Sequence, residues 1–90
     1  MSMTDDAAIA ADIRLLLSDR APDASICPSE VARRLWPDDA WRDVMPDVRR
    51  VAVRLAEIGV IRITQSDAEL DPGAPMTGPI RLRRGPRWLD

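Results

Sequence analysis

One segment in the second half of the chain constrains its fold more than any other. Apolar side chains recur from Val48 to Ile58 at the 3.6-residue spacing of a helix, and polar side chains fill most positions between them. Gly59 then suits the left-handed backbone conformation that ends many helices. Residues 60–64 alternate apolar and polar side chains with the two-residue period of a strand. We therefore predict a helix over residues 46–58, with Ile58 in the core, that runs directly into a strand.

Two further helices are predicted upstream of this segment. The first starts near Thr4, an N-cap residue type, and has Asp5 and Asp6 in its first turn, where carboxylates oppose the helix dipole. It ends near Arg20, shortly before a proline. The second begins at Pro28, because the missing N–H of proline suits the first helical position.

A hairpin completes the pattern. Residues 80–83 alternate apolar and polar side chains, as residues 60–64 do, and are predicted to form the second strand of the hairpin. Residues 25–27 are a candidate for a short additional strand. The loop between the hairpin strands is long and rich in Asp, Pro and Gly, so we expect its tip to be mobile. This order of elements is typical of a winged helix. The prediction is an α+β fold with three helices and a short two- to three-stranded antiparallel sheet.

Length and composition bound the domain and exclude several kinds of site. The 90 residues form one domain, with a core over residues 5–84 and a tail over residues 85–90. The chain has no histidine, and Cys27 is its only cysteine, so neither an internal disulfide, a Cys/His zinc site nor a histidine-activated nucleophile can form. The neighbouring carboxylates Asp38 and Asp39 point in different directions at a helix start, and a helix cap explains Asp38 better than acid–base catalysis does. We expect no enzymatic activity, cofactor, metal or small-molecule substrate.

Cys27 itself precedes a helix N-terminus, where the dipole favours a thiolate. A redox sensor acting through an intermolecular disulfide and a small packing residue both remain open.

The basic residues are all of one type and are unevenly distributed along the chain. All 13 are arginine, whose planar fork makes bidentate contacts to phosphate, carboxylate or guanine. Net charge is -2, but residues 1–45 carry five arginines and nine acids, whereas residues 46–90 carry eight and six. That asymmetry permits a basic face in the second half.

Seven arginines of the long helix and the hairpin are candidate nucleic-acid contacts. They are Arg49, Arg50 and Arg54 on the helix, and Arg62, Arg81, Arg83 and Arg84 on the outer face of the hairpin. In this interpretation they contact phosphates and base edges from one common patch. In the alternative, the helix arginines pair with Asp47 and Glu57, and the others are charges that protect a sheet edge. Trp88, in the tail, either contacts a partner or folds back over the first helix.

Several segments resemble a known family. They are residues 26–32 (ICPSEVA), 41–46 (WRDVMP), 63–65 (ITQ), 70–72 (LDP) and 78–83 (GPIRLR). In this order they resemble a bacterial family of small winged-helix-like proteins catalogued only as a domain of unknown function. The resemblance covers residues 8 to 83. It implies the fold and a bacterial cytoplasmic origin, and it brings no established activity.

Two functions are compatible with these observations. The leading hypothesis is a DNA-binding, transcription-related module that places helix 46–58 in the major groove and the 60–84 hairpin on adjacent phosphates. The alternative is a protein–protein adaptor or regulatory subunit, or a homodimer, which the overall acidity, the acidic loop and Trp88 favour. No apolar run reaches the roughly 18 residues of a membrane span, and the first residues lack a secretion signal, so we expect a cytoplasmic protein without membrane contact.

Overall fold

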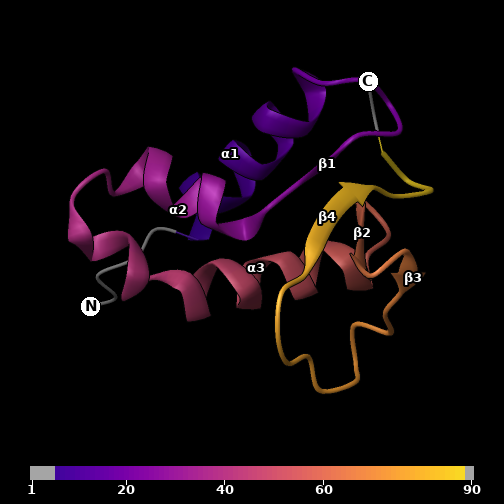
Figure 1. Cartoon of the computed structure of the whole chain (residues 1–90). Coiled ribbons are helices and arrows are strands. Elements are labelled where there is room, and N and C mark those ends of the chain that lie inside the picture. The colour runs from indigo at the N-terminus through magenta and orange to yellow at the C-terminus, as the bar shows by residue number, and fades with distance from the viewer. Residues whose placement is uncertain (1–5, 89–90) are drawn as a thin grey trace.

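The computed structural model describes residues 6–88 and has three α-helices and a small antiparallel sheet (Figure 1). The helices are α1 (Asp6–Ser18), α2 (Pro28–Leu35) and α3 (Met45–Glu57), with a single 3-10 turn, η1 (Asp39–Arg42), before α3. The strands are β1 (Ser25–Ile26), β2 (Ile61–Gln65), β3 (Ala68–Glu69) and β4 (Arg81–Arg84). The α+β class is therefore as predicted. The sheet has four strands, one more than the sequence led us to expect.

The ends of the predicted elements agree closely with the structure. Helix α2 begins at Pro28, and Gly59 follows α3 with a φ of 83°, the left-handed conformation predicted for it. Asp38 holds the N-cap position of η1, but its side chain makes no capping hydrogen bond. The predicted cap at Thr4 and the first-turn Asp5 lie outside the described residues.

The helices and one face of the sheet enclose a single hydrophobic core. Its fully buried members are aliphatic and come from every layer: Ile9, Ile13 and Leu17 of α1, Val31 and Ala32 of α2, Val48 and Ala52 of α3, and Ile26, Ile61, Ile63 and Leu82 of the sheet. Leu55 is only half-buried, and Ile58 is 58% exposed, so the prediction that Ile58 lies in the core is wrong. Helix α3 ends at Glu57, and Ile58 as its C-cap no longer follows the helical period.

The sheet has the strand order β1-β4-β2-β3. Strand β1 joins the hairpin as predicted and pairs with β4, with Ile26 opposite Leu82. Strands β2 and β4 pair with Ile63 opposite Leu82 on the core side and Arg62 opposite Arg83 on the other side. Because side chains alternate along a strand, one face of the sheet is apolar and covered by helices, and the other carries arginines.

The predicted long loop contains the extra strand. Ser66 and Asp67 have φ values of 50° and 68°, the pair of positive values that a two-residue type I′ hairpin requires, and they join β2 to β3. The chain then projects from the sheet before it returns to β4 (Figure 1). The side-chain amide of Gln65 donates to the carbonyls of Thr77 and Pro79, at 2.7 and 2.9 Å, and so fixes the returning segment to β2. The mobility of this loop remains a prediction.

The segment after β4 folds back onto the corner between α3 and β2. The amide of Gly85 donates to Val60, and that of Arg87 donates to Gly59, each at 2.9 Å. The backbones pack so closely that a Cβ on Gly85 would lie 2.8 Å from the carbonyl of Ile61, so only glycine fits there. Among residues 6–88, no helix is long and apolar enough to cross a membrane.

Candidate nucleic-acid interface

Helix α3 presents one side to the core and the other to solvent. Val48, Val51 and Ala52 point inward, while Arg50 and Arg54 are exposed. Its 13 residues span about 20 Å at 1.5 Å per residue, enough to lie across a DNA major groove. The outward side of α3 is therefore the first surface on which the candidate arginines can be assessed.

Arg50 is occupied within the protein. Its guanidinium donates to both carboxylate oxygens of Asp6, at 2.7 and 2.8 Å, and to Asp47 at 3.0 Å. The hydrogen bond to Asp6, followed by that to Asp47, raises the pKa of Arg50 above its ordinary value. The reciprocal bond from Arg50 lowers the pKa of Asp6. Two carboxylates thus surround this cation, and its pairing with Asp47 is the one that the alternative interpretation predicted.

Arg49 and Arg54 form no salt bridge with a carboxylate of residues 6–88. Arg49 donates to the carbonyl of Gly78 at 2.8 Å, which ties α3 to the end of the β3–β4 loop. The Arg54 side chain is exposed and makes no hydrogen bond or salt bridge with any residue between 6 and 88, although its charge helps to lower the pKa of Asp6. Neither charge is therefore paired within residues 6–88; Arg54 lies on the outward side of α3, and the half-buried Arg49 lies on its flank beside the β3–β4 loop.

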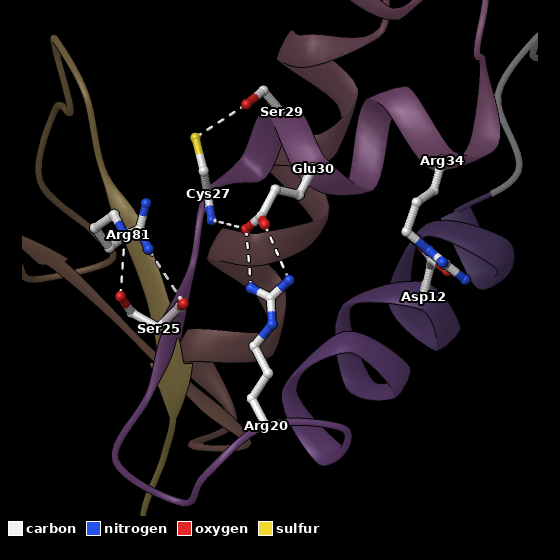
Figure 2. Close-up of polar contacts among 8 residues, drawn as sticks. All are labelled: Asp12, Arg20, Ser25, Cys27, Ser29, Glu30, Arg34 and Arg81. Atoms are coloured by element: carbon white, nitrogen blue, oxygen red, sulfur yellow. Dashed lines mark hydrogen bonds and ion pairs between the residues drawn. The ribbon is translucent and has the colours of Figure 1, made fainter.

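A second group of arginines lies on the outer face of the sheet. Arg62 and Arg83 are opposite one another in β2 and β4, and Arg81 points to the same side. Arg81 donates to the hydroxyl and carbonyl of Ser25, at 3.0 and 3.2 Å (Figure 2). Arg83 donates to the carbonyl of Asp23 at 2.7 Å, and Arg62 to that of Arg84 at 3.0 Å.

The two groups do not form the common patch that the leading hypothesis expected. Helix α3 packs on the face of the sheet that carries Ile61, Ile63 and Leu82, and the Arg62 group points away from that face. The structure therefore separates the arginines of α3 from those of the sheet.

Arg84 does not belong to the outer face, and that part of the prediction is wrong. Its register partner is Ile61, so it points to the core side of the sheet. There it donates to the carbonyls of Leu17 and Arg20, at 3.0 and 2.9 Å, and stacks 5.1 Å from the ring centre of Trp88. It thereby satisfies carbonyls at the C-terminal end of α1. Because side chains alternate along a strand, residues 83 and 84 lie on opposite faces of the sheet. This alternation in the sequence could have placed Arg84 on the core side.

The hairpin lacks cations where a winged helix would approach phosphates. Between Ile63 and Ile80 the chain has no arginine, whereas Asp67, Glu69 and Asp71 are exposed there. The carboxylate of Glu69 also lies 4.0 Å from the guanidinium of Arg62 and offsets part of the positive charge of that arginine. This loop would repel a phosphate backbone.

Trp88 folds back over the first helix, which is one of the two alternatives that the sequence left open. The half-buried side chain lies beside Ala11, Leu15 and Ser18 of α1 on one side and beside Ile58 and Val60 on the other. A contact with a partner remains compatible with this position.

Cys27 lies in a polar cluster at the start of α2 (Figure 2). Its sulfur is 3.1 Å from the hydroxyl of Ser29, and its amide donates to Glu30 at 2.7 Å. Arg20 donates to both oxygens of the same carboxylate, at 3.0 and 3.2 Å. The bond from Arg20 is the main reason why the pKa of Glu30 lies below its ordinary value. Within residues 6–88 no three His, Cys, Asp or Glu side chains group as metal ligands would.

Comparison with known sequences gives the family of this chain. No curated protein matches it. The profile of a family described as Protein of unknown function (DUF3253) matches residues 6–85, nearly the whole chain. The residues from the first turn of α1 to the turn after β4 are all included. The chain therefore belongs to the DUF3253 family.

Proposed function

We propose that this domain is a non-enzymatic module that binds double-stranded DNA, and that α3 enters the major groove. Arg54 is the central contact, and Arg49 contributes beside it. The observation that carries the proposal is the state of the Arg54 guanidinium: it is exposed on the outward side of α3 and makes no hydrogen bond or salt bridge among residues 6–88, and Asp6 interacts with it only through its charge. A guanidinium in this state is available for bidentate contacts to guanine or to phosphate.

The order of the elements supports this role. Helix α2, the turn η1 and helix α3 are followed by a hairpin, and β1 pairs with its second long strand. This order is typical of winged helices, in which the helix before the hairpin reads the major groove. Arg49 uses one N–H for Gly78 and keeps its charge and its remaining donors.

The acidic loop limits the interface. The exposed carboxylates Asp67, Glu69 and Asp71 disfavour the approach of this loop to phosphates. With two cations that form no salt bridge among residues 6–88, the proposal predicts weak binding, with a Kd of about 10⁻⁴ to 10⁻⁶ M at physiological salt. The slope of log K against log salt should be close to -1.8, since each neutralised phosphate contributes about 0.9.

Fluorescence anisotropy with a labelled duplex of about 20 base pairs, in a salt series, tests this proposal. Arg54→Gln should reduce the salt slope by about 0.9 and weaken binding at low salt. Arg83→Gln is the matched control, because it removes one charge from the opposite side of the sheet and should leave both values unchanged. Absence of binding at about 100 µM protein in low salt, or an equal loss in the two variants, would refute the role of α3.

A further inference from the structure

An exposed apolar surface lies where α1 and α3 end. Leu15 is 54% exposed and Ile58 is 58% exposed, and these are the two large hydrophobic side chains with high exposure in the described part of the chain. Both lie beside Trp88. We call Leu15, Ile58, Pro86 and Trp88 the Trp88 surface.

Two shallow hollows flank the indole ring. Leu15, together with Ala11 and Ser18, lines the hollow over α1, which has a volume of about 350 Å³. Ile58, together with Val60 and Pro86, lines the hollow over the end of α3, of about 500 Å³. Single exposed aliphatic residues are ordinary on protein surfaces, but here two of them share one surface with a tryptophan. In a domain of this size most aliphatic side chains are needed in the core, so this arrangement suggests an interaction.

Each hollow also contains one arginine. Arg14 lines the first and Arg87 lines the second, and no carboxylate of residues 6–88 lines either of them. Neither guanidinium makes a hydrogen bond or ion pair with residues 6–88, whereas Arg20, Arg34 and Arg50 each hold a carboxylate. The Trp88 surface therefore has an apolar centre, and at its rim lie two positive charges that no carboxylate in the described part of the chain pairs with.

We propose that the Trp88 surface binds a protein partner through an acidic segment that carries large apolar side chains. The apolar side chains enter the two hollows, and carboxylates of the same segment pair with Arg14 and Arg87. Apolar side chains in the centre and ion pairs at the rim are the usual anatomy of such an interface. This role is additional to DNA binding by α3 and does not depend on it.

The geometry disfavours two other occupants. In a twofold contact between copies of this chain, the same surface faces itself, so Arg14 and Arg87 would meet the same arginines of the second copy. A membrane surface is matched by side chains that project into it. Trp88 instead is half-buried against α1, with the guanidinium of Arg84 over its ring and a hollow on each side.

Selection from a displayed library of random 16-residue peptides against the full chain tests the proposal, followed by anisotropy measurements on the enriched peptides. The enriched sequences should carry net negative charge and at least two large apolar residues. Leu15→Ser with Ile58→Ser, and separately Arg14→Glu with Arg87→Glu, should each weaken binding by about tenfold or more. Arg42→Glu is the matched control and should leave binding unchanged, because Arg42 lies before the opposite end of α3. Circular dichroism should show that all variants remain folded.

Three results would overturn the proposal. The first is enrichment of peptides without acidic residues, or of peptides that bind the Leu15→Ser, Ile58→Ser variant equally well. The second is a concentration-dependent dimer in sedimentation velocity that this variant loses, which would identify a second copy as the occupant. The third is co-sedimentation with phosphatidylserine vesicles that this variant loses, which would identify a membrane.

Discussion

At the scale of single residues, most candidate arginines hold the fold together. Arg50 joins α3 to the first turn of α1, Arg49 joins α3 to the loop before β4, and Arg81 joins β4 to β1. In each case one guanidinium reaches an acceptor in a distant part of the chain. A planar fork with five N–H donors suits this task better than an ammonium group. Arg50, which holds two carboxylates, is therefore poorly available for DNA, whereas Arg49 keeps donors beyond its one bond to Gly78 and the Arg54 guanidinium makes no bond among residues 6–88.

Arg84 gives a direct test of this structural role. Arg84→Lys should reduce the free energy of unfolding by about 1–3 kcal/mol, because one ammonium cannot reproduce the two bonds to the end of α1 or the stacking on Trp88. Urea denaturation measures the change. Arg87→Lys, on an exposed side chain, should change it by less than about 0.5 kcal/mol. Equal effects at the two positions would show that Arg84 is not a structural residue.

Glu30 should make stability depend on pH in the acid range. Its pKa is lowered in the folded protein, chiefly by the hydrogen bond from Arg20. A lowered pKa stabilises the fold above the unfolded-state pKa, and this contribution disappears as pH falls through the folded-state pKa. The Tm difference between the parent protein and Glu30→Gln should therefore be largest near neutral pH and shrink towards about pH 3. Glu57→Gln is the control, because it removes an exposed carboxylate whose side chain makes no hydrogen bond among residues 6–88, and its Tm difference from the parent protein should be smaller. If the Tm difference for Glu30→Gln stayed constant with pH, the charge of Glu30 would not contribute to stability.

At the scale of elements, β3 depends on the two-residue turn before it. Ser66 and Asp67 both have positive φ, which costs energy for residues other than glycine and asparagine. The absence of an Asn-Gly pair is the reason why this hairpin was not visible in the sequence. Register is then set by the pairing of Thr64 with Glu69.

Replacement of the turn residues should stabilise the hairpin. Ser66→Asn with Asp67→Gly should increase the free energy of unfolding by about 0.5–1 kcal/mol, because both residues adopt the required conformation with less strain. Thermal denaturation measures the gain. Asp71→Gly is the control, because it also removes one exposed negative charge but lies beyond β3, outside the turn. It should not stabilise the protein. A loss of stability in the Asn-Gly variant would contradict the type I′ turn.

At the scale of the whole molecule, the core and the Trp88 surface are separate sets of apolar residues. Ile13, in α1, is completely buried, whereas Leu15 two residues later is mostly exposed. The fold therefore uses only part of its apolar side chains, and those at the ends of α1 and α3 remain accessible.

Substitutions in the core and in the Trp88 surface should therefore reduce the free energy of unfolding by different amounts. Leu15→Ser with Ile58→Ser should change the free energy of unfolding by no more than about 1 kcal/mol, since both side chains are exposed. Ile13→Ala should cost about 2–5 kcal/mol, because it removes a fully buried side chain and leaves a cavity. Chemical denaturation of the two variants gives both values. If the double variant lost as much as Ile13→Ala, the Trp88 surface would be part of the core.

The sequence by itself determined the three helices, the strands β1, β2 and β4, and their order. The helical period over Val48–Ala52, the proline at the start of α2 and Gly59 after α3 act on the backbone within a turn or two, so they are visible locally. The alternation of β2 and β4 also fixed which side chains face the core, and it would have separated Arg84 from Arg83 had it been applied to β4 residue by residue.

Only the tertiary structure decided which arginines have partners. Arg50 meets Asp6 across 44 residues, and Arg84 meets the end of α1 across 67 residues. Such contacts depend on how helices and sheet pack, and no period in the sequence encodes them. The same packing left Leu15 and Ile58 beside Trp88 at the surface and put the sheet between two groups of cations. The type of each side chain can be read from the sequence, whereas its access to a ligand depends on how the whole chain folds.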